Sequence, residues 1–325
     1  MQTIDNTIGR DVATTIARIS VDPDRALAAL TEIDDLHRAN GSPNETPILW
    51  RLARQARPIL SAHLPAAVAA VEAHSQPFGP CAVAIEGLAP TGSRLSPDAQ
   101  RVLALALGSP LGSPFQYLQQ NDGVLVPGLS PTPGVVANSG ASPGPFAAHS
   151  DDAILPPHLR VRSIALFGVE NETRVPTGYA PIEAILDRLD RPDRAILMTP
   201  DFAVRKPHSF DLDGGSWSAP LPLVFENAAG ELCVQCPTYN TRPLGAAAAR
   251  AFAGFRRAVD EALQWLVVGE GSYMVFRNDR GLHARPPIAG RRTVLRTYWR
   301  PDTASLQAAT GQAGPVFDLR PLLAG

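Results

Sequence analysis

The hydrophobic pattern changes its period after residue 80, and this change limits the folds open to the chain. Before that point, apolar residues recur every three or four positions over 11–36 and 47–73, which predicts helices. Residues 81–85 are instead a short apolar run followed by glycine and proline, the pattern of a buried strand. The sequence therefore predicts a helical leader, residues 1–80, in front of a region of short strands, residues 81–300.

The remaining pattern predicts more strands than helices. Helices are expected over 96–107, 181–189 and 245–266, and strands over 161–169, 221–225, 232–236, 272–276 and 293–299. The turn 226–231 joins two of these strands and suits a hairpin. Helices in front of many short strands favour an α+β fold with an antiparallel barrel or jelly-roll core, formed as one domain over 1–325 with a tail over 301–325.

One connection is too long to be passive. Residues 108–145 are rich in glycine, proline, serine and asparagine and separate two predicted elements. Long segments of this kind in compact domains usually act as lids or binding loops. We therefore expect residues 108–145 to form a lid over the functional site.

The composition excludes several classes of partner. Charged residues make up 18% of the chain and its formal net charge is −2, so it has no basic footprint for nucleic acid or an anionic membrane surface. No apolar stretch reaches the length of a bilayer span, and the first residues lack the features of a signal peptide. We expect a small-molecule substrate, no nucleic-acid or membrane partner, and a cytoplasmic location.

The three cysteines are too few for a disulfide framework and too few for a four-cysteine zinc site. Cys81, Cys233 and Cys236 are therefore expected to be reduced and buried. Cys233 and Cys236 fall on a predicted strand and not at the start of a helix, where a thiol would become reactive.

The chain has seven histidines, of which only His149 is followed two residues later by a carboxylate, Asp151; about one such match is expected by chance, but this one closes the long loop and precedes a predicted strand. On an extended segment these two side chains point to the same face and could bind one metal. His283, which follows the apolar run 273–276, is the candidate third ligand. Two histidines and a carboxylate are the ligands of non-haem Fe(II) oxygenases.

Two alternatives remain open on the same residues. A hydrolase could use His149, Asp151 and His283 to hold Zn²⁺ and activate water. A protein that keeps the fold and binds a ligand without catalysis is the second alternative.

Two arginines provide a candidate anchor for an anion. Arg292 and Arg296 lie four residues apart on the last predicted strand and therefore on one face. A guanidinium there could hold a dicarboxylate through two hydrogen bonds.

Three blocks of the sequence resemble a known family. They read FAAHSDDAILPPHLR at 146–160, NDRGLHAR at 278–285 and RRTVLR at 291–296. Together they resemble the clavaminate synthase-like branch of the taurine dioxygenase superfamily, which includes hydroxylases of free amino acids. The resemblance covers roughly residues 81–299. It implies a double-stranded β-helix (jelly-roll) core with flanking helices, and the use of Fe(II), 2-oxoglutarate and O₂.

The resemblance assigns His149, Asp151 and His283 as iron ligands. Many members of the branch carry glutamate where this chain has Asp151, while aspartate is usual in the taurine dioxygenase relatives. Family members also place a threonine for 2-oxoglutarate about as far after the first histidine as Thr177, which lies 28 residues after His149.

The same resemblance gives the two arginines their roles. Arg292 corresponds to the arginine that pairs with the distal carboxylate of 2-oxoglutarate. Arg296 would contact the substrate carboxylate or assist in binding the co-substrate. The segment between His283 and Arg292 is shorter than in the amino-acid hydroxylases, so the roles of the two arginines could be exchanged.

Substrate contacts implied by the resemblance fall in the expected lid. Gln120 corresponds to a partner of the substrate amine, and Ser139 to a serine that meets the substrate backbone. Relatives that hydroxylate arginine or lysine carry two acids where this chain has residues 237–240, which contain none. An unpaired cation there would cost several kcal/mol. The sequence thus predicts hydroxylation of a C–H bond in an amino acid, or a derivative, with a non-cationic side chain, in specialised metabolism. Desaturation or cyclisation remains open.

Overall fold

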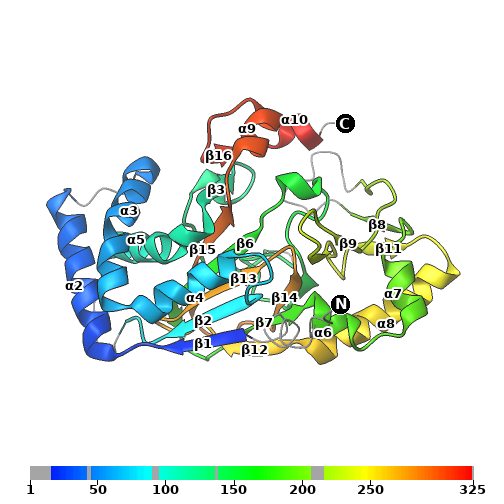
Figure 1. Ribbon diagram of the computed structural model, residues 1–325, viewed down its shortest axis with the longest axis horizontal. Coiled ribbons are helices and arrows are strands. Elements are labelled where there is room, and N and C mark those ends of the chain that lie inside the picture. Colours follow the sequence, from blue (N-terminus) through cyan, green and yellow to red (C-terminus); the bar gives the residue numbers. More distant parts are fainter. Residues whose placement is uncertain (1–15, 42–44, 90–94, 136–137, 206–215, 324–325) are drawn as a thin grey trace, which may run out of the picture.

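The computed structural model of the 325-residue chain contains two antiparallel-rich sheets between two groups of helices (Figure 1). It describes residues 16–41, 45–89, 95–135, 138–205 and 216–323. Within these ranges, no helix is both long enough and apolar enough to cross a membrane.

The larger sheet has eight strands. Its order is β1 (Ile16–Ser20), β2 (Ala82–Glu86), β13 (Tyr273–Arg277), β6 (Ser163–Asn171), β15 (Arg292–Arg300), β3 (Ser113–Tyr117) and β16 (Val316–Phe317), with β4 (Gly128–Leu129) paired to β15. Only the β1–β2 and β3–β16 pairs in this sheet are parallel. The long strands β6 and β15 form its centre.

The second sheet is smaller and wholly antiparallel. Its order is β12 (Gln264–Val267), β7 (Pro176–Pro181), β14 (Gly281–Arg285) and β5 (Phe146–His149). An apolar cluster joins its Tyr179 and Leu266 to Ile164, Leu166 and Phe276 of the larger sheet. The two sheets therefore face each other across a shared core, an arrangement consistent with a jelly-roll fold.

Two short hairpin-like pairs complete the strands. They are β9 (Val224–Glu226) with β10 (Leu232–Val234), and β8 (Phe202–Val204) with β11 (Thr241–Pro243). The β9–β10 pair confirms the hairpin predicted around 226–231, since Glu226 pairs with Leu232.

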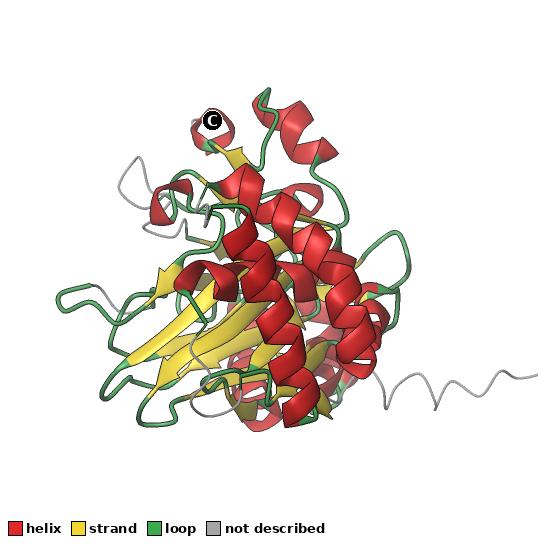
Figure 2. Cartoon of the chain, turned by 90° about the vertical axis from the view of Figure 1, so that its left-hand side faces the viewer, coloured by secondary structure: helices red, strands yellow, loops and turns green. Residues whose placement is uncertain are grey.

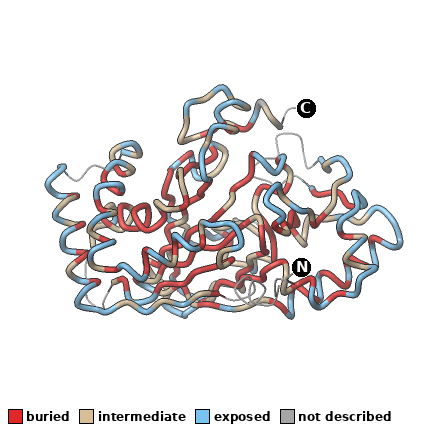
Figure 3. Tube along the Cα trace, in the orientation of Figure 1, coloured by how far each residue is buried: buried red, intermediate tan, exposed pale blue. Residues whose placement is uncertain are grey.

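Helices cover the outer faces of the sheets (Figures 1 and 2). On one side lie α2 (Pro23–Ala39), α3 (Thr46–His63), α4 (Pro65–Ser75) and α5 (Pro97–Gly108); on the other lie α6 (Ile182–Leu186), α7 (Arg191–Leu197) and α8 (Ala246–Ala262). The first group packs on the larger sheet through one core that includes Leu52, Leu103, Phe167, Val275 and Trp299. Many of the buried residues accordingly lie in the strands between the two groups of helices (Figure 3).

Capping residues account for where the helices begin. The Asp22 carboxylate accepts the backbone N–H groups of Asp24 and Arg25, and Pro23 occupies the first turn of α2. Ser96 accepts the backbone N–H of Ala99 at the start of α5. Both are favoured N-terminal signals, because they satisfy donors that the helix leaves unpaired.

The helix predicted over 11–36 is wrong in its first part. Residues 11–15 lie outside the described residues, and residues 16–20 form β1 instead, paired in parallel with β2. Helix α2 starts only after the Asp22 cap. The single periodic stretch over 47–73 is also interrupted, because the chain turns at Leu64 before Pro65 begins a new helix, α4.

The helix predicted over 245–266 ends too late. Helix α8 stops at Ala262, Leu263 is extended, and β12 follows at Gln264. Trp265 and Leu266 continue the apolar pattern of the helix, so periodicity alone does not reveal that they pair with β7.

The expected lid over 108–145 is wrong in its first half. It contains β3, in which Phe115 and Tyr117 are fully buried, and β4, which pairs with β15. The expected tail over 301–325 is likewise part of the core in one place. Its β16 pairs with β3, and Phe317 is fully buried. The remaining described helices are α9 (Ala304–Thr310), α10 (Arg320–Leu323) and the single turns η1 (Ser109–Leu111), η2 (Asn121–Gly123) and η3 (Pro157–Leu159).

The cysteine prediction is confirmed. Cys81, Cys233 and Cys236 are unpaired and buried. Burial raises the pKa of each thiol to about 12. These side chains are therefore protonated at neutral pH and pack as small apolar groups.

A buried ionic cluster holds the turn between β13 and β14. Glu231 accepts hydrogen bonds from Arg277 and Arg280, each at 3.2 Å, and from the backbone N–H of Phe78 at 3.0 Å. All three charged side chains are at most 2% exposed. Arg277 also pairs with Asp279. The cluster therefore fixes the hairpin whose second strand carries His283.

We expect Glu231→Ala to lower the free energy of unfolding by about 3–5 kcal/mol, because it leaves two guanidinium groups buried without their shared partner. Denaturant unfolding measures this loss. Glu170→Ala is the matched control, since Glu170 pairs with Arg291 at a site where both side chains are at least 40% exposed; it should cost less than about 1 kcal/mol. Equal losses in the two variants would contradict a structural role for the cluster.

Candidate metal centre

Two predicted ligands face each other across a pair of neighbouring strands. His149 ends β5 and is the direct register partner of His283 in β14. Their imidazole rings lie 4.0 Å apart, centroid to centroid. The antiparallel register therefore brings together two side chains that are 134 residues apart in the sequence.

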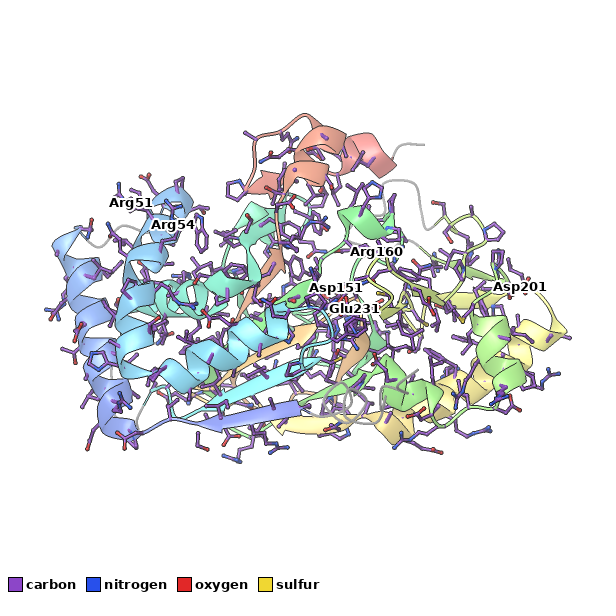
Figure 4. All side chains as sticks on the ribbon, viewed as in Figure 1. Arg51, Arg54, Asp151, Arg160, Asp201 and Glu231 are labelled. Atoms are coloured by element: carbon purple, nitrogen blue, oxygen red, sulfur yellow. The ribbon has the colours of Figure 1, made fainter. Side chains whose placement is uncertain are left out.

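Asp151 completes the group two residues after β5. Its Oδ1 lies 3.3 Å from His149 Nε2 and 3.9 Å from His283 Nε2. One possible ligand atom from each of the three residues lies within 4.8 Å of the others, the arrangement expected of a metal site. The sequence-based grouping of these three residues is thus confirmed. Figure 4 labels Asp151 near the centre of the molecule.

The hydrogen bonds of His149 fit a metal ligand. His149 Nδ1 lies 2.8 Å from the carbonyl oxygen of Ala147, so Nδ1 must carry the hydrogen and donate it. The other nitrogen, Nε2, is buried and has no hydrogen-bond partner. This nitrogen lies 3.3 Å from Asp151 Oδ1, so a metal could bind both atoms. The Phe146 ring stacks on the imidazole at 3.8 Å and fixes its plane.

The protonation states also suit a metal cation. Burial and the neighbouring His149 lower the pKa of His283 to about 3, so this imidazole is neutral. Burial opposes ionisation of Asp151, but the contacts with His149 and the nearby His283 and Arg296 hold its pKa well below the ordinary value. Two imidazoles and one carboxylate are a donor set for a divalent transition metal.

Two residues that sequence reasoning missed hold Asp151 in place. The Asn278 side chain accepts the Asp151 backbone N–H at 2.8 Å and donates to its carbonyl oxygen at 3.2 Å. The Tyr298 hydroxyl donates to Asp151 Oδ2 at 2.6 Å. Burial raises the pKa of Tyr298 well above its ordinary value, so the phenol keeps its proton. Side chains two residues apart on a strand share a face, so the sequence places Tyr298 on the same face of β15 as Arg292 and Arg296.

The neighbouring carboxylate, Asp152, belongs to a separate contact. Tyr117 donates to its Oδ2 at 2.9 Å. Burial and the adjacent charge of Asp151 raise the pKa of Asp152 to about 7. Asp152 points away from the two histidines toward β3, so it is not part of the triad.

All predicted site residues line one cavity of about 680 Å³. The cavity lies between the two sheets and is lined by both strands of the triad and by β15. The predicted residues on its wall are His149, Asp151, His283, Thr177, Arg292, Arg296, Gln120 and Ser139. Segments from most of the chain, including the second half of the expected lid, therefore meet at one site.

Thr177 and Arg292 form one end of this cavity. Arg292 Nη2 donates to Thr177 Oγ1 at 3.1 Å, and both side chains are buried. Burial and nearby Arg285 lower the pKa of Arg292 to about 10, which leaves it cationic at neutral pH. Among the described residues no carboxylate pairs with Arg292, and its Nε has no hydrogen-bond partner. This end of the cavity therefore carries a positive charge that no carboxylate among the described residues neutralises.

Arg296 lies nearer the triad. Its Nη2 donates to Gln120 Oε1 at 3.0 Å, and its Nη1 lies 3.9 Å from Asp151 Oδ2. The guanidinium sits over the Tyr298 ring, 4.2 Å from its centroid. Since a guanidinium has only donors, this contact fixes the Gln120 oxygen toward Arg296.

Arg285 is a further cation that the sequence analysis did not single out. It lies two residues after His283 on β14, and it donates to the carbonyl oxygens of Ser142 and Pro286. Because side chains two residues apart on a strand share a face, the sequence places Arg285 on the same face as His283. It ties the segment before β5 to the metal-binding strand.

We expect His149→Ala, Asp151→Ala and His283→Ala each to lower the affinity for Fe(II), or for Co(II) as an air-stable probe, by at least about 100-fold. This loss should exceed that for residues outside the ligand shell, which is roughly 10- to 100-fold. Calorimetric titration under anaerobic conditions measures the affinity, and circular dichroism verifies the fold. Metal binding that survives in all three variants would show that the metal lies elsewhere.

Comparisons with known proteins agree on the fold. No protein-family model and no curated protein matches the sequence. Solved structures do match. An asparagine oxygenase in complex with Fe(II), 2S,3S-3-hydroxyasparagine and succinate superposes with a TM-score of 0.79 at 20% identity, over 93% of this chain and 99% of that chain.

A second solved protein gives the same result. The non-heme iron oxygenase OrfP with Fe and alpha-ketoglutaric acid superposes with a TM-score of 0.74 at 23% identity, over 92% of this chain and 98% of that chain. A substituted OrfP in complex with (3S)-hydroxy-L-Arg reaches a TM-score of 0.76 at 20% identity, over 93% of this chain and 100% of that chain. The chain therefore has the fold of non-heme iron oxygenases along nearly its whole length.

Proposed function

We propose that the chain is an Fe(II)- and 2-oxoglutarate-dependent oxygenase that hydroxylates a C–H bond of an amino acid or amino-acid derivative. In this proposal residues 1–325 form one oxygenase domain, with a helical layer on a double-stranded β-helix core. The observation that carries it is the pairing, in one cavity, of a His/Asp/His triad with a buried arginine that has no carboxylate partner among the described residues.

The triad would hold the iron through His149 Nε2, Asp151 Oδ1 and one nitrogen of His283. Fe(II), when bound, supplies the O₂ chemistry that couples decarboxylation of 2-oxoglutarate to oxidation of the substrate. The protein residues contribute positioning. Asn278 and Phe146 orient two of the ligands.

The 2-oxoglutarate would lie between the triad and the Thr177 end of the cavity. Arg292 would pair with the distal carboxylate, since no carboxylate among the described residues neutralises its buried charge. The Thr177 hydroxyl lies 3.1 Å from Arg292 Nη2 and would donate to the same carboxylate. The contact between Thr177 and Arg292, which Arg296 does not share, supports Arg292 over Arg296 for this role.

The substrate would occupy the other side of the triad, beside Arg296, Gln120 and Ser139. Arg296 would hold the substrate carboxylate, and Gln120 and Ser139 would contact its backbone. The matching asparagine oxygenase and the substituted OrfP are complexes with 2S,3S-3-hydroxyasparagine and (3S)-hydroxy-L-Arg, respectively.

The charge of the cavity bears on the substrate side chain. Four arginines line it, namely Arg205, Arg285, Arg292 and Arg296, against two acids among the described residues, Asp151 and Asp152. Asp151 faces the histidines and Asp152 accepts from Tyr117. No carboxylate in the described lining is thus left for a cationic side chain, which supports a substrate whose side chain is uncharged or acidic.

The zinc-dependent hydrolase, the non-catalytic binding protein and the desaturase or cyclase use the same residues. Neither the cavity nor the matching structures favours any of them, and they become outcomes of the activity test.

The direct test is a screen of free and derivatised amino acids for substrate-stimulated succinate formation with Fe(II), 2-oxoglutarate and O₂. Uncharged and acidic amino acids should stimulate succinate release, and mass spectrometry should find a product heavier by one oxygen. A product lighter by two hydrogens would instead mark the desaturase. Stoichiometric zinc with no turnover of 2-oxoglutarate would overturn the proposal in favour of the hydrolase.

Arg292→Ala should weaken 2-oxoglutarate binding by about 2–5 kcal/mol, or roughly 30-fold to more than 1,000-fold, because a buried carboxylate loses its charged partner. Thr177→Ala should lose about 1 kcal/mol, roughly fivefold. Dissociation constants from anaerobic calorimetry measure both. A larger loss in Arg296→Ala would mean that the two arginines have exchanged roles.

A lid is proposed for the part of residues 108–145 that follows β4. This part forms no strand in the described residues, and Val135, Asn138 and Ser139 from it line the cavity. Its far end is already anchored, because Arg285 donates to the Ser142 carbonyl at 2.7 Å and Ile288 donates to that of Pro143 at 2.8 Å. Closure should therefore concern mainly the residues before Ser142.

Hydrogen exchange is measured with Fe(II) and 2-oxoglutarate present, before and after an unreactive analogue of the substrate is added. Backbone amides between β4 and Ser142 should gain protection when the analogue binds. Peptides covering β3 serve as the internal control, since that strand is already buried. Protection that is the same with and without the analogue would mean that the lid is preformed.

A further inference from the structure

We propose that Tyr298 is a positioning residue for the metal ligand Asp151, and that it reserves one carboxylate oxygen for the metal by holding the other. This inference rests on the proposed metal site and adds a residue that the triad does not include. It concerns which oxygen of Asp151 can reach the metal.

The two oxygens of Asp151 have different partners. Oδ1 faces the histidines, 3.3 Å from His149 Nε2 and 3.9 Å from His283 Nε2. Of the two acceptors within reach of the Tyr298 hydroxyl, Gln120 Oε1 lies at 3.0 Å and Asp151 Oδ2, which takes its single proton, lies at 2.6 Å. This length is that of a charge-assisted O–H···O⁻ bond, which is about twice as strong as a neutral one. The carboxylate is therefore held with one oxygen turned toward the metal position.

A competing cation makes this restraint necessary. Arg296 Nη1 lies 3.9 Å from the same Oδ2. Without the phenol, a small rotation of the Asp151 side chain would bring Oδ2 into a direct ion pair with Arg296 and turn Oδ1 away from the histidines. The Tyr298 ring also lies under the Arg296 guanidinium, 4.2 Å from its centre, and so supports that arginine from one side.

The position of Tyr298 in the fold gives the restraint its rigidity. Tyr298 is 1% exposed and lies in β15, paired to Phe115 of β3 on one side and Ile164 of β6 on the other. The histidines belong to β5 and β14 of the opposite sheet. Asp151 lies in the connection after β5, where the Asn278 side chain holds its backbone. The phenol thus fixes a loop carboxylate to the centre of the larger sheet.

Tyr298→Phe removes the hydroxyl and keeps the ring. We expect it to weaken Co(II) and Fe(II) binding by about 10- to 100-fold, the range typical of outer-shell partners of metal ligands. Anaerobic calorimetry measures the affinity, and the visible spectrum of bound Co(II) should change because the carboxylate is no longer fixed. Neither readout depends on turnover.

Tyr117→Phe is the matched control. Tyr117 is also a fully buried phenol that donates to a neighbouring carboxylate, Asp152 at 2.9 Å, but that carboxylate is outside the triad. Its metal affinity and Co(II) spectrum should match the wild type. Should Tyr298→Phe not fold, 4-fluorophenylalanine at position 298 provides a second ring without a donor, and 4-aminophenylalanine, which keeps a donor, should restore binding.

The outcomes separate this inference from the proposed function. Wild-type affinity and spectrum in a folded Tyr298→Phe variant would overturn the positioning role and leave the oxygenase proposal standing. Equal losses in Tyr298→Phe and Tyr117→Phe would also overturn it, since they would reflect general loosening. Wild-type protein that binds neither metal would remove the proposed function itself.

Discussion

The register between β5 and β14 is the constraint on which the site depends. It sets His149 directly opposite His283, and a slip of one residue would turn one imidazole to the other face of the sheet. The buried cluster around Glu231 holds the turn that leads into β14, and Asn278 in the same turn binds the Asp151 backbone. The geometry of the triad, the position of the hairpin and the packing of the core between the sheets therefore depend on one another.

Charge organises the rest of the cavity. Buried guanidinium groups are costly unless paired, yet Arg292 has no carboxylate partner among the described residues. Arg296 has only a distant one in Asp151. A cavity that carries this unbalanced positive charge beside a candidate metal site is suited to anionic ligands that also chelate a metal. A 2-oxo dicarboxylate satisfies both demands at once.

Local patterns made most of the site predictable, whereas contacts between distant segments did not. His149 and Asp151 share a strand-like spacing, and Arg292 and Arg296 share a strand face, so the sequence alone groups each pair; the link to Thr177 needed the family resemblance. Tyr298 was missed because a buried tyrosine on a strand looks like core until its partner is known. Trp265 and Leu266 continue the apolar period of the preceding helix, so the pattern predicts helix where β12 forms. Glycine and proline surround β3, so the pattern predicts a lid where this strand forms.

The central claim is that the triad and Arg292 form one binding site for 2-oxoglutarate, and its most direct test is anaerobic calorimetry with and without Fe(II). The account predicts that 2-oxoglutarate binds about 100-fold more tightly to the iron-loaded protein than to the metal-free protein, because two linked groups then bind together. Glutarate, which keeps both carboxylates but lacks the oxo group, should show little dependence on the metal. Equal affinities of 2-oxoglutarate for the two forms would contradict the account.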